Sequence, residues 1–98
     1  MSQPIYQMWM MKAKEPWYQL SDEEQANILA KISESFDAVG AENVVSCDSS
    51  WSGEPWQFFG LVKFPDIEAV KKHRQDTNAI NWARYADAMS LLGTEWQP

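Results

Sequence analysis

His73 is the single histidine of the 98-residue sequence and the side chain best suited to proton transfer. Its unperturbed pKa lies near neutrality, so its imidazole can act as a general acid or base at physiological pH. The run Lys71-Lys72-His73-Arg74 is also typical of a solvated helix face. Two interpretations of His73 therefore stay open: a catalytic acid or base, or a further polar residue on an exposed helix.

Aromatic side chains are the second feature that suits a binding or catalytic site. Six Trp, three Tyr and four Phe make up 13% of the chain, more than a small core needs. Tyrosine hydroxyls can hydrogen-bond a developing enolate, and an indole can form a pocket wall for a flat or hydrophobic ligand. We expect most of the rings to fill the core and a subunit interface. We predict that Tyr6, Trp82 and Tyr85 line a pocket and that Trp17 closes its mouth.

A group of polar residues follows His73 at a predicted interruption of the helix. It consists of Asp76, Thr77, Asn78 and Asn81. Asn78 and its neighbours could hydrogen-bond a polar substrate, and those in the next turn could orient His73. The alternative is that Asp76 or Asn78 caps the following helix, which is the commoner role of such residues.

Other kinds of site have little support in the sequence. One cysteine, Cys47, excludes an intramolecular disulfide, and a buried inert thiol is its expected state. With one histidine and no paired Cys or His motif, we predict no metal site. The four glycines stand apart, so no loop of the phosphate-binding type is present. We expect no cofactor.

Charge and hydropathy restrict the partners and the compartment. Eight basic and fourteen acidic residues give a net charge of −6, which disfavours nucleic acid and anionic membrane surfaces as partners. No run approaches the roughly 20 apolar residues of a membrane span, and no leader is visible at the start. A single thiol fits a reducing compartment, so the expected localisation is cytoplasmic.

The elements that position these residues can be read from the apolar spacing. Strands are predicted at residues 5–11 and 56–64, each apolar on both faces, and at residues 43–51 and 89–96, at the edges. The first helix begins at the capping box Ser21-Asp22-Glu23-Glu24 and ends at Gly40. Asp66 caps the second helix, which carries His73 and is followed, after the interruption, by a further helical piece through Trp82 and Tyr85.

The order strand-helix-strand-strand-helix-strand predicts one ferredoxin-like α+β domain over residues 1–98. Its four-stranded antiparallel sheet has strands one and three at the centre, which are the two that are apolar on both faces. Two helices cover one face of such a sheet and leave the other face apolar and wet. We therefore predict a homodimer in which two copies pack sheet against sheet.

This combination resembles the dimeric α+β barrel superfamily over about residues 5–96. The resemblance lies in the order of elements and in the stretch Phe64-Pro65-Asp66-Ile67-Glu68-Ala69-Val70-Lys71-Lys72-His73, and it is closest to small bacterial members of unassigned function. It implies a pocket between the sheet and its own helices. Members include cofactor-free monooxygenases, cyclases, isomerases, haem proteins and stress-associated proteins. The asparagine of the small haem-degrading branch has no counterpart in residues 5–11, where the polar residue is Gln7.

Two hypotheses for the function follow from the residues and the resemblance together. The first is a cofactor-independent isomerase, cyclase or monooxygenase that acts on a hydrophobic or aromatic metabolite, with His73 as base and Tyr85 as its catalytic partner. Its predicted substrate-binding residues are Tyr6, Trp82, Asn78 and Trp17. The alternative is a non-catalytic small-molecule-binding or stress-associated dimer. Whether His73 faces a cavity of ligand size distinguishes the two.

Overall fold

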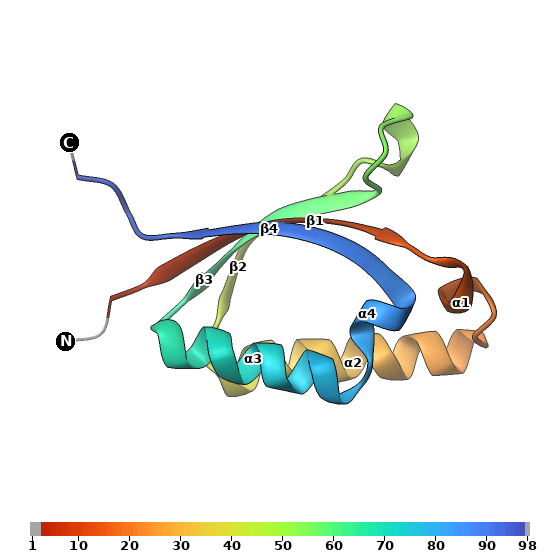
Figure 1. Ribbon diagram of the computed structural model, residues 1–98, viewed down its shortest axis with the longest axis horizontal. Helices are drawn as coiled ribbons and strands as arrows, with labels where there is room; N and C mark the ends of the chain where they lie inside the picture. Colours follow the sequence, from red (N-terminus) through yellow and green to blue (C-terminus); the bar gives the residue numbers. More distant parts are fainter. Residues whose placement is uncertain (1–2, 98) are drawn as a thin grey trace.

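The computed structural model describes residues 3–97 and shows one curved sheet with its helices on one side (Figure 1). In chain order the elements are β1 (Ile5–Ala13), α1 (Glu15–Tyr18), α2 (Asp22–Ala38), β2 (Glu42–Asp48), β3 (Phe58–Phe64), α3 (Ile67–Ala79), α4 (Trp82–Tyr85) and β4 (Ala86–Gly93). With α1 and α4 as additional short helices, this order is the predicted ferredoxin-like arrangement.

The four strands form an antiparallel sheet in the order β2-β3-β1-β4. The prediction that strands one and three occupy the centre is therefore confirmed. β1 pairs with both β3 and β4, and each pairing runs along most of its length. Because β1 and β3 have neighbours on both edges, their backbone groups are paired inside the sheet.

The capping box predicted for α2 is present. Ser21 Oγ accepts a hydrogen bond from the Glu24 amide at 3.1 Å, and the Glu24 carboxylate accepts one from the Ser21 amide at 3.0 Å. At the other end of α2, Gly40 has a φ of +75°, a conformation that glycine adopts without a steric penalty. Both ends of α2 are thus determined by local sequence, as expected.

The predicted interruption at Asp76-Thr77-Asn78 is wrong. Asp66 caps α3 as expected, with the Ala69 amide donating to Asp66 Oδ1 at 2.8 Å, but the helix continues to Ala79. The Asp76 side chain bonds to residues of α2 and α3, so it neither competes for the helix backbone nor caps the next helix. The break lies at Asn81, which has a φ of +57° and makes no side-chain cap to α4.

The hairpin between β2 and β3 is longer than predicted. β2 ends at Asp48 and not at residue 51, because Asp48 Oδ1 accepts hydrogen bonds from the amide and the hydroxyl of Ser50 and starts a 3₁₀ turn over Ser50–Ser52. β3 begins at Phe58 and not at residue 56. The connecting loop rises from the sheet on the side away from the helices (Figure 1).

The last strand also differs from the prediction. β4 was expected at residues 89–96, but it begins at Ala86 directly after α4 and ends at Gly93. It pairs with β1 from Ala13 and Ala86 onward, so this strand extends back to the end of the last helix. Trp96 lies beyond the strand and is 82% exposed.

The core lies between the sheet and the helices α2 and α3. Its buried residues are Val62, Phe64, Ala69 and Val70, and partly buried hydrophobic residues pack around them. Trp9 is one of these, and its indole lies so close to Gly60 that a Cβ there would come within 2.7 Å of the ring. β3 can therefore pass under Trp9 because it carries no side chain at that point.

The opposite surface of the sheet, which we call the open face, carries two adjacent apolar rows. The strand register places Met10, Phe59, Met89 and Cys47 in one row, and Met8, Leu61, Leu91 and Val45 in the next. Charged residues lie at both ends, with Lys12 paired to Asp87 at one end and Glu42 to Lys63 at the other. Helices α2 and α3 lie on the other side of the sheet (Figure 1).

The edge strand β2 is irregular. Its register against β3 shifts between Asn43 and Val45, which is a β-bulge that leaves one residue of β2 without a direct partner. The bulge brings Glu42 and Val45 onto the same face of the sheet, so the apolar rows of the open face continue onto the edge strand.

None of the helices within residues 3–97 is both long and apolar enough to cross a membrane.

Candidate functional site

The two short helices bring together three of the aromatic residues predicted for a pocket. The ring of Trp17 on α1 contacts those of Trp82 and Tyr85 on α4, with ring centroids 5.7 and 6.2 Å apart in edge-to-face geometry. Lys14 joins the two helices, because its amide donates to the Tyr85 carbonyl at 2.9 Å and its ammonium group to the Ala83 carbonyl at 3.1 Å. This cluster is a fixed aromatic surface.

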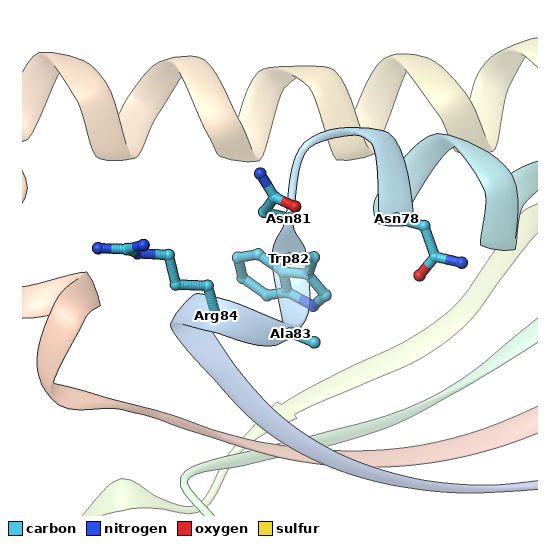
Figure 2. Close-up of a pocket in the computed structure, with 5 residues that line it drawn as sticks. All are labelled: Asn78, Asn81, Trp82, Ala83 and Arg84. Atoms are coloured by element: carbon cyan, nitrogen blue, oxygen red, sulfur yellow. The ribbon is translucent and has the colours of Figure 1, made fainter.

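A cavity of about 380 Å³ lies beside this cluster, at the connection between α3 and α4. Its lining residues are Asn78, Asn81, Trp82, Ala83 and Arg84. Figure 2 shows the indole between Asn78 on one side and Arg84 on the other, with Asn81 above it. The left-handed conformation of Asn81 turns the chain sharply between the two helices. The site combines one flat apolar ring with two amides and a cation.

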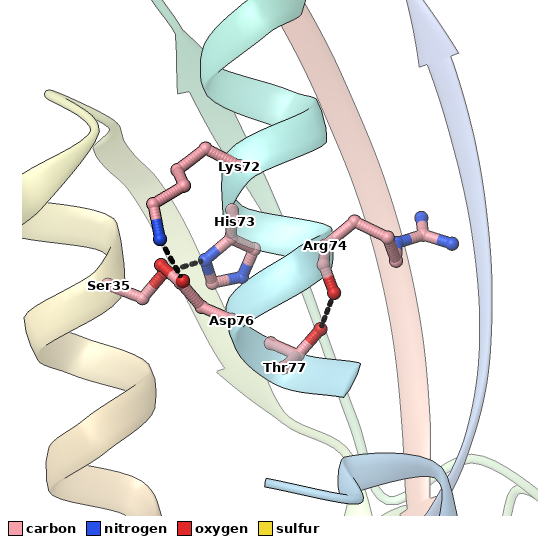
Figure 3. A network of polar contacts seen from close by, with 6 residues as sticks. All are labelled: Ser35, Lys72, His73, Arg74, Asp76 and Thr77. Atoms are coloured by element: carbon pink, nitrogen blue, oxygen red, sulfur yellow. Dashed lines mark hydrogen bonds and ion pairs between the residues drawn. The ribbon is translucent and has the colours of Figure 1, made fainter. Parts of the chain in front are cut away.

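His73 occupies a different place, in the contact between α2 and α3. Its Nδ1 lies 2.9 Å from Ser35 Oγ, and the Ser35 hydroxyl donates to Asp76 Oδ2 at 2.7 Å (Figure 3). Lys72 Nζ donates to the other oxygen of the same carboxylate. The imidazole stacks on Phe36, with ring centroids 4.0 Å apart, and lies near Phe64 of the core.

The hydrogen bonds of Ser35 determine which ring nitrogen of neutral His73 carries the proton. Ser35 has one hydroxyl proton, which it donates to Asp76, so it accepts the contact from His73. The neutral imidazole therefore carries its proton on Nδ1. Ser35 is 6% exposed, which leaves its hydroxyl inaccessible as a nucleophile. The Asp76-Ser35-His73 network thus orients the ring and ties α3 to α2.

Burial lowers the pKa of His73 below its usual value, against the attraction of Asp76, while Arg74 lowers it further. Hydrogen bonds from Lys72 and Ser35 lower the pKa of Asp76, so this carboxylate stays ionised at neutral pH. His73 is therefore neutral in the folded protein at neutral pH.

The lowered pKa of His73 predicts a loss of stability in mild acid. Below about pH 6.5 the unfolded chain binds a proton at His73 that the folded protein takes up only at lower pH. The free energy of unfolding should therefore decrease as the pH falls from 6.5 towards the folded-state pKa of His73. Above pH 6.5 the contribution of His73 should not change with pH. Urea unfolding at several pH values between 5 and 8 measures this dependence.

Two variants test the assignment to His73. His73→Asn keeps a donor near Ser35 but does not titrate, so it should remove most of this pH dependence. Arg74→Gln leaves the hydrogen bonds of His73 intact and should retain most of it. An unchanged pH dependence in His73→Asn would assign the effect to another group.

The structure separates the predicted site residues into three places. Trp82 and Asn78 line the cavity, and Trp17 and Tyr85 pack beside it. Tyr6 lies on the open face, where it lines a second, shallow cavity, and His73 lines neither of these two cavities.

Sequence reasoning missed two residues that matter here. Arg84 lines the cavity, and its place directly between Trp82 and Tyr85 in the sequence was a usable signal. Ser35, the partner of His73, carried no signal, because the two residues are 38 positions apart and meet through the packing of α2 on α3. Among residues 3–97, no group of three or more His, Cys, Asp or Glu side chains could hold a metal ion.

No family model matches the sequence, and no curated protein matches it. Solved structures do share its fold. A dabb-family protein with a ferredoxin-like fold from Mesorhizobium loti has a TM-score of 0.64 and 13% identity, over 98% of this chain and all of that one. A dimeric protein of unknown function with a ferredoxin-like fold from Bacteroides fragilis has a TM-score of 0.53 and 12% identity, over 94% of this chain and 96% of that one.

The predicted fold is thereby confirmed: the chain has the ferredoxin-like fold of these proteins. A haem-binding protein from Thermus thermophilus is also similar, with a TM-score of 0.74 and 15% identity over 99% of this chain. The chain spans 42% of that protein's length. Structural similarity at identities this low establishes a shared fold only, so the activity of this chain must be argued from its own residues.

Proposed function

We propose that this chain is a homodimeric, non-catalytic binding protein for a small aromatic or hydrophobic molecule. Two copies pair through their open faces, and each copy takes its ligand at the cavity beside Trp82. The observation that carries the binding function is this cavity, where an indole held by Trp17 lies among two carboxamides and an arginine.

The two apolar rows of the open face support the pairing. Five large hydrophobic side chains on these rows are 42–66% exposed in the single chain: Met8, Val45, Phe59, Met89 and Leu91. A contiguous apolar patch with charged residues at its ends has the layout of an interface core and rim. The similar protein from Bacteroides fragilis is described as dimeric, which agrees with this assembly.

The chemistry of the cavity supports a flat ligand with a polar edge. The indole of Trp82 can stack on or contact an aromatic ring edge-to-face. Asn78 and Asn81 offer both donors and acceptors, while Arg84 can pair with an anionic group or stack on a ring. An apolar body is therefore held by the indole, and its orientation is set by the polar side chains.

The position of His73 supports binding over acid–base catalysis. Its ring is stacked on Phe36 and hydrogen-bonded to Ser35, and it lines neither the cavity beside Trp82 nor the shallow one on the open face. A general base must come within hydrogen-bond reach of the proton that it removes. The side chains that line the cavity beside Trp82 are two amides, an indole, a methyl group and an arginine, none of which is a base at neutral pH.

One observation favours the enzyme as a second candidate function. His73 is neutral, and the network with Ser35 and Asp76 fixes its tautomer, which leaves the Nε2 lone pair as the basic atom. An oriented neutral imidazole is what a cofactor-independent isomerase, cyclase or monooxygenase would need. This candidate predicts that the wild-type protein chemically converts its ligand and that His73→Asn does not.

Native mass spectrometry of the protein purified from its host tests the proposal. We expect an assembly of two 11.3 kDa chains that retains a small molecule. Replacing both Asn78 and Arg84 by alanine should abolish retention without loss of the dimer, because both residues are exposed. Lys31→Ala, an exposed change on α2, is the matched control and should retain the molecule. Retention that is unaffected by the double substitution would contradict this location of the site.

A further inference from the structure

Trp51 is 83% exposed, which places it among the most exposed large hydrophobic residues in the range 3–97. It lies at the tip of the loop between β2 and β3, within the turn Ser50–Ser52. An exposed indole in this position is a large apolar surface without a partner among the described residues, and tryptophan is one of the residue types enriched at the energetic centres of interfaces.

The loop that carries Trp51 has its own hydrogen-bond framework. The Ser49 amide donates to the Gln57 carbonyl at 2.8 Å, and the Ser49 hydroxyl donates to the Trp56 carbonyl at 2.8 Å. The Ser52 amide donates back to the Ser49 carbonyl, and Gly53 with a φ of +78° completes the turn. The loop thus presents the indole from a constrained backbone, which lowers the entropic cost of using it in binding.

The shallow cavity on the open face, which we now call the groove, has a volume of about 560 Å³ and lies towards the end of the sheet away from this loop. Tyr6 and Met8 of β1, Leu61 of β3, and Leu91 and Leu92 of β4 supply its apolar lining. The loop rises on the same side of the sheet as this groove (Figure 1), since the helices lie on the other side.

We propose that Trp51 of each copy inserts into the Tyr6–Met8–Leu61–Leu91 groove of the other copy. This inference rests on the proposed pairing of open faces and specifies its geometry. If the two-fold axis placed both loops at the same end, the two rising tips would meet each other between the sheets. If the two-fold axis instead places the loop end of one copy over the groove end of the other, each loop tip lies over its partner's groove. Symmetry then buries both indoles in the same way.

Trp96 is the other strongly exposed tryptophan, at 82%, and it provides the comparison for Trp51. It follows β4 by three residues and lies in a segment without regular secondary structure. Because the end of β4 forms part of the groove, occupation of the groove by the chain's own Trp96 is the alternative that an experiment must separate.

Disulfide trapping tests the insertion directly. In a Cys47→Ser background, Trp51→Cys combined with Met8→Cys should give a covalent dimer on a non-reducing gel. Trp51→Cys combined with Lys31→Cys, on the helix side, should not. A covalent dimer from Trp51→Cys alone would place both loops at one end and overturn the proposal. A dimer by light scattering without the Trp51–Met8 cross-link would overturn it while leaving the pairing intact.

Sedimentation of two single variants gives an independent measurement. Trp51→Ala should raise the dimer dissociation constant by about 30-fold, the effect expected for a residue at an energetic centre. Trp96→Ala should leave the constant unchanged. The reverse pattern would assign the groove to Trp96. If the wild-type chain is a monomer at micromolar concentration, the proposed pairing fails, and the insertion of Trp51 fails with it.

Discussion

Replacing Leu91 by glutamate is expected to convert the proposed dimer to monomers at micromolar concentration. Leu91 lies in the second apolar row of the open face and is 66% exposed in the single chain. In the dimer a carboxylate at this position would be removed from water without a cationic partner, which costs several kcal/mol. We expect the dissociation constant to rise by at least 100-fold, equivalent to about 2.7 kcal/mol. Light scattering coupled to size exclusion measures the mass.

Leu29→Glu is the matched control for Leu91→Glu. Leu29 is also an exposed leucine, at 51%, but it lies on α2 on the other side of the sheet. The same change of side chain there should leave the dimer intact. Because both leucines are exposed in the single chain, circular dichroism should show that both variants remain folded. A dimeric Leu91→Glu protein would show that the open face is not the interface.

Replacing Gly60 by alanine should destabilise the fold more than any other glycine-to-alanine change among the four. A Cβ at residue 60 would lie 2.5 Å from the Val45 carbonyl oxygen and 2.7 Å from the Trp9 ring. The carbonyl belongs to the neighbouring strand and cannot rotate away, so β2 must shift or β3 must bend. Overpacking of this kind costs about 1–3 kcal/mol. For a domain of this size, each kcal/mol lowers the Tm by about 4–8 °C.

Gly93→Ala provides the control for Gly60→Ala. Nothing lies within 4 Å of a Cβ built at residue 93, and its backbone is not in the left-handed region. The melting temperature of Gly93→Ala should therefore equal that of the wild type or be slightly higher. Equal melting temperatures for the two variants would mean that Trp9 and β2 can move aside, and that the close approach at Gly60 carries no constraint.

Local sequence signals predicted the fold well where one element determines its own boundaries. The ends of α2 follow from the capping box at Ser21 and the left-handed glycine at residue 40. The central position of β1 and β3 followed from their apolar residues on both faces. The caps of α2 involve residues only a few positions apart, and the burial of β1 and β3 is reflected in their apolar pattern. Both signals are visible in a single sequence.

Boundaries that depend on distant partners were not predictable. Residues 76–78 have types that often cap helices, yet Asp76 bonds to Ser35 from another helix and α3 continues through them. The start of β4 at Ala86 is set by its pairing with Ala13 of β1 and not by any change in apolar spacing. In both cases the partner is far away in the sequence.

The candidate site was predictable in part for the same reason. Trp82 and Asn78 are close in sequence, so their common cavity could be anticipated, and Trp17 packs against Trp82 beside it. The orientation of His73 could not be read from its basic neighbours. Its helix turns the imidazole onto Phe36 while Lys71 and Arg74 remain exposed, so the ring is half-buried between two helices.

The bulge in β2 has a consequence for what kind of assembly this chain can form. A regular edge strand offers a row of free backbone groups on which further copies can add without limit, as in fibrils. The register shift between Asn43 and Val45 twists and interrupts that edge. Addition of further copies at the β2 edge is thereby discouraged, whereas in the proposed dimer the apolar rows make one face-to-face contact that closes on itself. In the proposed dimer the open face is thus covered by one partner, while β2 offers no regular edge on which a further copy could add.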